Sequence, residues 1–361
     1  MDRDYKRLVI KIGSNVLAGK DGLPDEDRMR RLTGEISALR KQGREIVLVS
    51  SGAVAAGRSL VKVSEKSDEV EARQLLASVG QVLLIRRYAD LFKTHDLLCS
   101  QVLVTKEDFR DKVHYKNMHS CFEILLRHHI IPVVNENDVI SVTELMFTDN
   151  DELAGLIASM IKADALIILT NVDGLYNGDP KEPGSVLLEK VQPSVVDFSQ
   201  YISTRKSDFG RGGMLTKSNM ARKVARLGIP VHLANGTRDH ILRDVLADAV
   251  PHTCFLPYKG ASATRRWIAH TDNYAKGSVQ VNEGARTALL GAKASSLLPV
   301  GITAINGEFG KNDIIRIVDQ KGRKIGLGMA KYDSGTAREY MGKNHQPPLV
   351  HYDYLYLNQE D

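Results

Sequence analysis

Hydrophobic and polar positions follow two alternating patterns over the N-terminal two-thirds of the chain. Short, near-continuous apolar runs rich in Val, Ile and Leu end at or next to small or polar residues such as Gly, Ser, Asn and Asp. Runs of this kind are typical of strands buried on both faces of a sheet. The predicted strands are 7–13, 45–52, 97–105, 130–135, 165–171 and 229–235.

Segments with apolar residues at helical spacing separate these strands. Strand and helix therefore alternate along the chain. This order predicts an α/β fold, with an open, mostly parallel sheet sandwiched by helices and joined by right-handed crossovers. The predicted helices are 25–42, 71–93, 115–129, 149–163, 216–227 and 238–248.

After Pro251 the pattern changes to short strands separated by frequent glycines. Close turn signals of this kind predict a small β-rich module. We expect a domain at 1–255, a linker at 256–275, the β-rich module at 276–350 and a tail at 351–361. The predicted strands of the module are 278–282, 302–306, 314–318 and 325–329.

Composition places the chain among ordinary globular proteins, with 361 residues of which 43 % are hydrophobic and 26 % charged. No apolar run approaches the length of about 18 residues that a membrane helix needs. The segment 1–11 lacks the apolar core of a signal peptide. Cys99, Cys121 and Cys254 lie far apart without a CxxC pair, which argues against a disulfide framework or a zinc site. We expect a cytoplasmic protein with no membrane partner.

Positive charge is concentrated in the predicted β-rich module. The chain has 49 Lys and Arg against 44 Asp and Glu, a net charge of +5. Residues 276–350 hold 11 Lys or Arg and 6 Asp or Glu, so the module's excess equals that of the whole chain. Two interpretations stay open, a nucleic-acid-binding surface or an ordinary solvated basic surface.

Small, polar and charged residues follow the predicted strands at the edge where parallel α/β sheets bind ligands. Their convergence on one rim is a stronger signal than any single motif. The stretches are 11–15, 50–53, 135–138 and 170–174, joined by 210–217 ahead of a later helix.

Two lysines in these stretches suit a phosphate ligand. Lys11 lies in an otherwise apolar strand, so it needs a partner, a ligand or an edge position in water. Lys217 follows a glycine-rich stretch at a helix start, where free N–H groups favour anions. The alternative for that stretch is a flexible loop capped by Thr216. Together the lysines would suit a triphosphate, since phosphoryl transfer depends on positioning and charge neutralisation.

Two common nucleotide fingerprints are absent from this chain. Residues 13–20 resemble a Walker A loop, but five residues separate Gly13 from Gly19, and Asp21 follows the lysine. The stretch 210–215 has Leu215 where a dinucleotide-binding motif needs its third glycine. A Rossmann dehydrogenase is therefore disfavoured.

The segment 148–152 opens a predicted helix and has two interpretations. Asp149 and Glu152 have the spacing of a capping box. Asp149 could equally hold the two lysines or a metal-bound phosphate, and Asn150 could bind a polar group of the substrate.

Taken together, these stretches resemble the amino-acid kinase family, and within it the members that phosphorylate glutamate. The β-rich module resembles the PUA domain that many bacterial members carry, and the likeness covers nearly the whole chain. The motifs that carry it are 9–14, 50–57, 74–81, 134–138, 149–151, 174–176 and 210–217.

The resemblance implies a role for each matching residue. Lys11 and Lys217 would contact the ATP phosphates, and Asp149 would orient both lysines; these three are the expected catalytic residues. Mg²⁺ would be held mainly by ATP, with no protein side chain assigned to it. The expected substrate-binding residues are Ser51, Gly52, Asn135, Asp138 and Asn150. The expected ATP-binding residues are Lys11, Thr170, Asn171, Arg211, Gly212, Gly213, Met214, Leu215, Thr216 and Lys217.

Two positions depart from the family pattern. Asn171 stands where the family often has Asp, so a side-chain amide would have to replace a carboxylate contact with the nucleotide. Arg211 stands where the resemblance leads us to expect Thr, and it either adds a phosphate contact or points outward.

The implied reaction needs no general base. A glutamate carboxylate has an ordinary pKa of about 4.3 and is already a nucleophile at neutral pH. We expect in-line attack of the γ-carboxylate of L-glutamate on ATP, giving an acyl phosphate and ADP. The resemblance implies the first step of proline biosynthesis, feedback by proline, a glutamyl phosphate reductase as pathway partner, and a homodimer or homotetramer.

Two other hypotheses stay open. Another amino-acid kinase, acting on aspartate or N-acetylglutamate, would be separated by substrate competition. An RNA-binding protein with a kinase-like scaffold would show salt-sensitive RNA binding that survives the substitution Lys217→Ala.

Overall fold

The computed structural model describes residues 4–19, 23–63, 68–109, 111–141, 147, 149–180, 182–192, 213–258, 268, 275–291 and 295–357. The chain divides into two compact units, Met1–Lys259 and Gly260–Asp361. The predicted linker at 256–275 lies mostly outside the described residues, so its extent stays a prediction.

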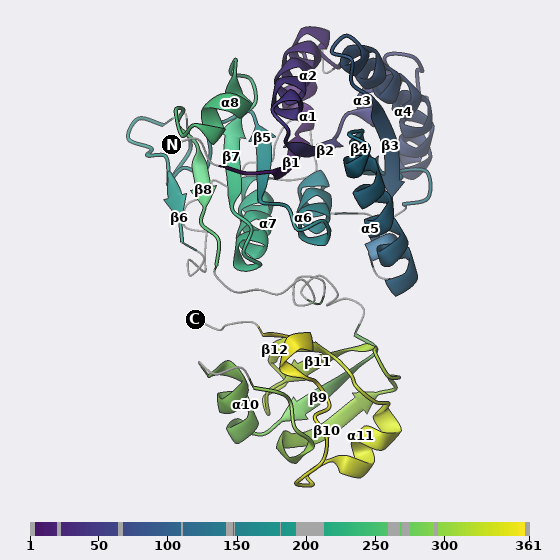
Figure 1. Ribbon diagram of the computed structural model, residues 1–361, viewed down its shortest axis with the longest axis vertical. Coiled ribbons are helices and arrows are strands. Elements are labelled where there is room, and N and C mark those ends of the chain that lie inside the picture. Colours follow the sequence, from purple (N-terminus) through teal and green to yellow (C-terminus); the bar gives the residue numbers. More distant parts are fainter. Residues whose placement is uncertain are drawn as a thin grey trace. The chain divides into compact units, whose positions relative to one another are not determined.

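The first unit is built on an eight-stranded sheet with the order β3-β4-β2-β1-β5-β7-β8-β6 (Figure 1). The five strands β3, β4, β2, β1 and β5 pair in parallel, as does β7 with β5, whereas β8 runs antiparallel to β7. The mostly parallel sheet that the sequence predicts is confirmed. The strands are β1 (Arg7–Ile12), β2 (Glu45–Ser50), β3 (Cys99–Val104), β4 (Ile131–Glu136), β5 (Ala165–Thr170), β6 (Lys190–Val191), β7 (Val231–Asn235) and β8 (Thr253–Phe255).

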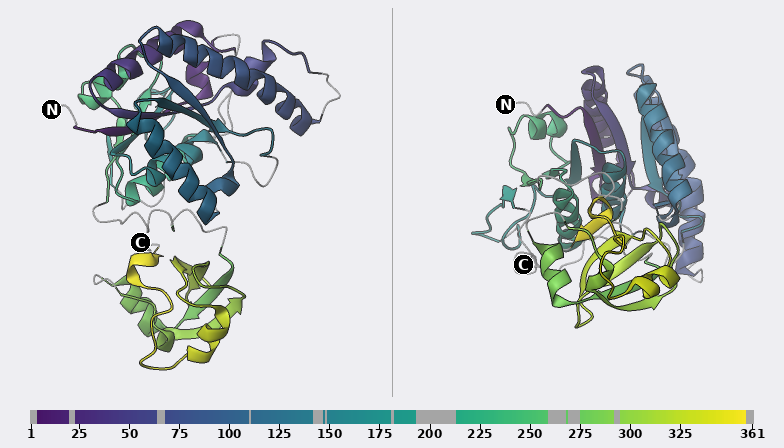
Figure 2. Two further views of the ribbon diagram at one scale, coloured as in Figure 1. Left: turned by 45° about the vertical axis from the view of Figure 1, so that its right-hand side comes forward. Right: turned by 60° about the horizontal axis from the view of Figure 1, so that its bottom comes forward.

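Helices cover both faces of this sheet (Figure 2). One face packs against α5, α6 and α7, and the other against α2, α4 and α8. The six predicted helices are all present, whereas the short α1 and α3 were not predicted. The helices are α1 (Ser14–Leu17), α2 (Glu26–Lys41), α3 (Ala53–Arg58), α4 (Glu69–Lys93), α5 (Lys112–Arg127), α6 (Asn150–Met160), α7 (Met214–Arg226) and α8 (Ile241–Leu246), with a 3₁₀ turn η1 (Lys106–Phe109).

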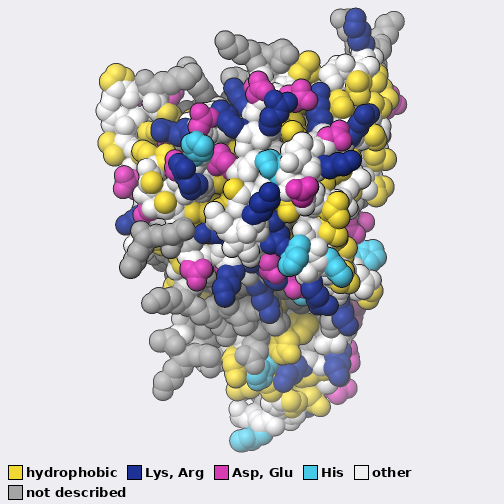
Figure 3. Space-filling view, turned by 45° about the horizontal axis from the view of Figure 1, so that its top comes forward, with side chains coloured by type: hydrophobic (Ala, Val, Ile, Leu, Met, Phe, Trp, Pro, Cys, Tyr) yellow, Lys and Arg dark blue, Asp and Glu magenta, His cyan; other side chains and the backbone are white. Residues whose placement is uncertain are grey.

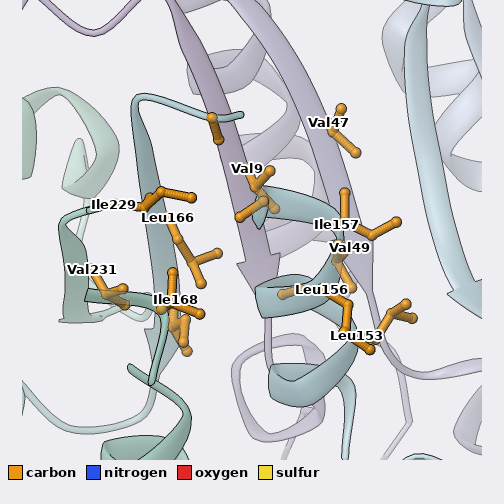
Figure 4. Close-up of a cluster of buried hydrophobic side chains, with 14 of the residues drawn as sticks. Val9, Val47, Val49, Leu153, Leu156, Ile157, Leu166, Ile168, Ile229 and Val231 are labelled. Carbon is orange, nitrogen blue, oxygen red and sulfur yellow. The ribbon is translucent and has the colours of Figure 1, made fainter. Parts of the chain in front are cut away.

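Alternation along β1 decides what its lysine faces. Leu8, Ile10 and Ile12 belong to the hydrophobic cluster under α2 and α8, whereas Val9 belongs to the cluster under α6 and α7 (Figure 4). Successive side chains of a strand point to opposite faces. Lys11 therefore shares the face of Val9 and points into the layer of α6 and α7.

Helices α3 and α4 pack closely because glycines lie at their crossing. A Cβ atom on Gly57 would lie 2.0 Å from the carbonyl oxygen of Leu76, and one on Gly80 would lie 1.8 Å from that of Ala53. Neither position has room for any other residue. Gly52 is the N-cap of helix α3, and its φ of 108° is the left-handed conformation that glycine adopts without strain. The crossing thus fixes the turn that follows β2.

We predict that Gly80→Ala lowers the free energy of unfolding by about 1–3 kcal/mol or more, because overpacking forces the two helices apart. Urea unfolding measures the effect. The matched control is Gly34→Ala in α2, where a Cβ would come no nearer than 3.7 Å, to His95. There the better helix propensity of alanine should leave stability unchanged or raise it by up to about 1 kcal/mol. Equal unfolding midpoints for the two variants would contradict the close crossing.

The second unit contains a five-stranded sheet with the order β10-β9-β11-β12-β13. The four strands predicted for the module are all present. Leu355–Leu357 lies in the segment predicted to be a tail, but it forms β13 and pairs antiparallel with β12. The sequence did not predict this strand because three residues are too few to show a periodic pattern. The elements are β9 (Gly277–Val281), α10 (Glu283–Leu290), η5 (Pro299–Gly301), β10 (Ile302–Gly307), β11 (Ile314–Val318), β12 (Lys324–Met329), α11 (Ser334–Tyr340), η6 (Tyr352–Tyr354) and β13 (Leu355–Leu357).

On the face of the molecule drawn in Figure 3, Lys and Arg side chains are interspersed with Asp and Glu. That view shows no large field of a single sign among the coloured residues. Within the described residues, Cys99, Cys121 and Cys254 take part in no disulfide bond. In the described part of the chain, no helix has both the length and the apolar character that crossing a membrane requires.

Candidate active site

The carboxyl ends of the central parallel strands lie level with one another. Ile12 of β1 pairs with Ser50 of β2 and with Leu169 of β5. Thr170, at the end of β5, pairs with Asn235 at the end of β7. The residues that follow these strands therefore meet at one rim, as the sequence predicts.

A buried carboxylate joins the two lysines at this rim. Lys11 Nζ lies 2.6 Å from Asp151 Oδ1, and Lys217 Nζ lies 2.9 Å from Asp151 Oδ2. Asp151 is fully buried in the first turn of α6, and Lys11 is only 4 % exposed. The edge position considered for Lys11 is therefore wrong, because β1 is a central strand and its lysine has a partner.

The two ammonium groups of this triad favour the ionised form of its carboxyl group. Burial by itself raises the pKa of Asp151, but the two ammonium groups and their hydrogen bonds outweigh burial and hold that pKa below its ordinary value. One carboxylate neutralises only one of the two lysines. Both ammonium groups of the triad lie in a site of low dielectric constant, where each interacts strongly with an anion.

The expectation that Asp149 orients the two lysines is wrong. Asp149 is the N-cap of α6, and its Oδ1 accepts hydrogen bonds of 3.0 Å from the backbone N–H groups of Asp151 and Glu152. Capping turns the Asp149 carboxylate back onto its own helix. Glu152 does not close a capping box, since its side chain pairs with Lys106 at 3.3 Å.

Asp149 retains one oxygen for another role. Its Oδ2 is buried and has no hydrogen-bond partner among the described residues. Burial, and then the charge of Asp151, raises the pKa of Asp149 to about 6, against the opposing charges of Lys11 and Lys217. No group of three or more His, Cys, Asp or Glu gathers as a metal site in the described ranges. This donor set fits Mg²⁺ that arrives on phosphates, because Mg²⁺ commonly takes only one or two protein carboxylates.

Asn150 links the ends of two strands on the other side of the rim. Its Nδ2 lies 3.2 Å from the carbonyl oxygen of Ser50, 2.8 Å from Ser51 Oγ and 3.0 Å from Asn135 Oδ1. Asn135 also donates to Gln81 of α4 at 2.9 Å. The structure therefore brings together Ser51, Asn135 and Asn150, three of the residues expected to bind substrate, next to the turn at Gly52.

Asp138, the fifth of these residues, has a partner that sequence analysis missed. Arg73 of α4 donates from Nε to Asp138 Oδ1 at 2.9 Å and from Nη2 to the same oxygen. Its Nη2 also lies 3.2 Å from Glu136 Oε2. The only sequence signal for Arg73 was its place directly before the motif at 74–81.

The expected nucleotide-binding residues lie mostly at the start of α7 and the end of β5. Gly213 is the N-cap of α7 without a side-chain hydrogen bond, so the alternative of a cap at Thr216, which lies inside the helix, is wrong. Met214 and Leu215 share this first turn. Thr170 Oγ1 lies 3.3 Å from Oδ1 of the exposed Asn171. The two remaining expected residues, Arg211 and Gly212, lie outside the described residues.

Comparison with known proteins decides the family. A model of the amino acid kinase family matches residues 6–235, more than half of the chain. The chain belongs to the amino acid kinase family. A PUA domain model matches residues 277–347 of this kinase, as expected for the β-rich module.

Two curated relatives, each named "Glutamate 5-kinase", match the kinase over nearly its full length. The protein of Bacteroides thetaiotaomicron is 52 % identical, covering 99 % of this chain and 100 % of the relative. That of Chlorobaculum tepidum is 50 % identical, covering 98 % of each. Among solved structures, carbamate kinase from Giardia lamblia bound to AMP-PNP has a TM-score of 0.52 at 18 % identity, covering 71 % of this chain and 99 % of that one. This structural likeness shows the fold alone.

We predict that Asp151→Asn lowers kcat of the kinase by about 10²-fold or more, because both lysines lose the carboxylate that positions them. The free energy of unfolding should fall by about 3–5 kcal/mol, the cost of leaving buried charge unpaired. Steady-state kinetics and urea unfolding measure the two effects. Glu152→Gln, which removes a carboxylate from the same helical turn, is the control and should change kcat less than about threefold. Similar losses in both variants would contradict the assignment.

Glu136, in β4, is another buried carboxyl group at this rim. Burial raises its pKa to about 7, and the charge of Asp138 acts in the same direction. The Phe147 backbone N–H, the Arg73 guanidinium and the Ser141 hydroxyl oppose that rise. Between its ordinary pKa and about 7, the folded protein therefore binds more protons at Glu136 than the unfolded chain does.

We predict that Glu136 makes the kinase less stable as pH rises from 5 to 8, since the folded state must give up a proton that the unfolded chain has already lost. Glu136→Gln should remove this part of the pH dependence, and substitution of the exposed Glu107 by Gln should not. Urea unfolding at both pH values measures it. An unchanged difference between pH 5 and pH 8 in Glu136→Gln would refute the raised pKa.

Proposed function

We propose that the chain transfers the γ-phosphoryl group of ATP to the γ-carboxylate of L-glutamate, giving L-glutamyl 5-phosphate and ADP. The observation that carries the proposal is the pairing of Lys11 and Lys217 with the buried Asp151, beside the polar contacts of Asn150 at one rim. The two relatives named "Glutamate 5-kinase" support the same activity.

The triad provides charge where phosphoryl transfer needs it. Lys11 and Lys217 lie on either side of Asp151, so both ammonium groups can contact oxygens of the moving phosphoryl group. Free N–H groups and the helix dipole at the start of α7 favour the other phosphate oxygens. Asp151 keeps the two ammonium groups close together against their mutual repulsion. Positioning and electrostatic stabilisation of this kind account for most of the catalysis of phosphoryl transfer.

The acceptor side suits an amino acid that carries its own nucleophile. The γ-carboxylate of glutamate is ionised at neutral pH, and no proton has to be removed before it attacks. Asp138 would bind the α-ammonium group, while Asn150, Ser51 and the turn at Gly52 would hold the rest of the substrate. In-line attack forms the bond from carboxylate oxygen to γ-phosphorus as the bond from phosphorus to the β,γ-bridging oxygen breaks.

Mg²⁺ would enter with ATP, with the unpartnered Oδ2 of Asp149 as its contact from the protein. Held there, the ion would neutralise negative charge on the phosphates.

The acidic character of the substrate site separates this proposal from other amino acid kinases. N-acetylglutamate has no α-ammonium group, so it would leave the buried Asp138 without a new positive partner. Aspartate is shorter by one methylene and would bring its carboxylate less close to the lysines. An RNA-binding protein with a kinase-like scaffold has no need of two lysines held together by a buried carboxylate at the rim.

Several further expectations stay predictions. An acyl phosphate is labile, so a glutamyl phosphate reductase that consumes it at once is the expected pathway partner. The pathway is proline biosynthesis, of which this reaction would be the first step. The other expectations are feedback by proline, a homodimer or homotetramer, RNA binding through the PUA domain, and a cytoplasmic location.

The proposal predicts hydroxamate formation when purified protein is incubated with Mg-ATP, L-glutamate and hydroxylamine, which traps the acyl phosphate. Lys217→Ala should lower the rate by about 10²-fold or more, because a charge that stabilises the moving phosphoryl group is lost. Lys41→Ala, at the exposed end of α2, is the control and should leave the rate unchanged.

The choice of substrate decides between the remaining hypotheses. Turnover with aspartate or N-acetylglutamate but not with glutamate would keep the mechanism and refute the substrate. Absence of turnover with all three amino acids would refute the kinase activity and favour the scaffold hypothesis.

A further inference from the structure

Arg73 is placed at the substrate side of the rim by a long helix. It lies in the second turn of α4, and its side chain is 20 % exposed. Its neighbour Gln74 donates from Nε2 to the carbonyl oxygen of Val139 at 2.7 Å. Two consecutive residues of α4 thus hold the turn that follows β4. The close crossing of α4 with α3 fixes this helix relative to the turn at Gly52.

Only some of the hydrogen-bond donors of the Arg73 guanidinium group have partners among the described residues. Its Nε and Nη2 both donate to Asp138 Oδ1, and Nη2 also contacts Glu136 Oε2. Arginine has five N–H donors in a planar fork. Within the described residues, the two donors on Nη1 have no partner, and Asp138 Oδ2 accepts no hydrogen bond.

The Nη1 donors of Arg73 and the Oδ2 acceptor of Asp138 therefore belong to two groups of opposite charge that lie next to each other. Two carboxyl groups, those of Glu136 and Asp138, share a single guanidinium, so the free oxygen of Asp138 can accept another cation. An α-amino acid carries an ammonium and a carboxylate group on the same carbon atom. A free carboxylate oxygen beside a free pair of guanidinium donors complements that arrangement, and charge-assisted contacts are the stronger class of hydrogen bond.

We propose that Arg73 binds the α-carboxylate of the amino acid substrate through Nη1, while Asp138, held by its Oδ1, binds the α-ammonium through Oδ2. Arg73 is then a specificity-determining residue that selects substrates with a free α-carboxylate. This inference rests on the proposed function, because it concerns how the same site recognises glutamate.

Lysine could not replace arginine in this role. Its ammonium group is a single point charge, whereas the planar guanidinium holds Asp138 and Glu136 along one edge and presents Nη1 along another. Arg73→Lys should therefore keep the salt bridge to Asp138 and lose the contact with the α-carboxylate.

The test compares L-glutamate with its α-amide, in which a neutral amide replaces only the α-carboxylate. Calorimetry without ATP gives Kd for both ligands with the wild type, Arg73→Met, Arg73→Lys and the control Arg86→Met. Arg86 lies on the same helix, exposed, and its nearest carboxylate is that of Asp90, at 3.7 Å. We expect the wild type and the control to prefer glutamate. In both Arg73 variants, Kd for glutamate should rise about 10- to 100-fold, as for lost hydrogen bonds to a charged group, while Kd for the α-amide changes much less.

A second variant distinguishes loss of the α-carboxylate contact from loss of the folded structure. Arg73→Met leaves Asp138 and Glu136 without their guanidinium, so the double substitution Arg73→Met with Glu136→Gln is measured alongside it. Thermal unfolding and KM for ATP report whether the fold and the nucleotide side are intact. The double variant should bind ATP normally and still show no preference for glutamate over its α-amide.

Other outcomes overturn the inference. An unchanged preference for glutamate in the folded Arg73 variants would exclude the contact with the α-carboxylate. An equal loss of affinity for both ligands would reduce Arg73 to a positioning residue for Asp138. A wild type that binds glutamate with this selectivity but yields no hydroxamate with Mg-ATP would contradict the proposed reaction alone. A wild type that binds neither ligand would contradict both.

Discussion

The ion triad of Lys11, Asp151 and Lys217 is the constraint on which the rest of the site depends. A lone ammonium group in a central strand would be costly to bury, and a lone carboxylate inside a helix layer would be equally costly. Each charge is tolerable only because the others are within hydrogen-bonding distance. The triad therefore requires β1, α6 and α7 to meet at one point, and the apolar cluster of Val9, Leu153 and Val224 around it holds them there.

The rim around this triad has a phosphate side and a substrate side, and different strands form each of them. Strand β5 and helix α7 bring Thr170 and the free N–H groups of a helix start to the phosphate side. Strands β2 and β4 bring polar groups to the substrate side, where Asn150 ties them to the first turn of α6. Because Asn150 and Asp151 are adjacent in one helical turn, the same element positions the substrate contacts and the counter-charge of the lysines.

The main elements could be predicted because they depend on local pattern. The continuous apolar runs of the central strands and the long helical periods are visible in sequence, and each predicted element is present. Helices α1 and α3 and strands β6, β8 and β13 were missed because elements of so few residues show too little periodicity. Arg73 and Glu136 were missed because their roles arise from a contact between α4 and the end of β4. Residues so far apart in sequence show no local pattern that predicts such a contact.

The sequence by itself determined the alternation of strands and helices, the rim where the chemistry lies and the two lysines that serve it. Tertiary structure alone decided which carboxylate those lysines bind. Asp149 and Asp151 lie two positions apart in the same sequence motif, and the motif alone does not distinguish their roles. Capping directs Asp149 toward its own helix, whereas the packing of α6 between β1 and α7 directs Asp151 toward both ammonium groups. Side-chain direction within a turn depends on the neighbouring elements, and those become neighbours only when the chain has folded.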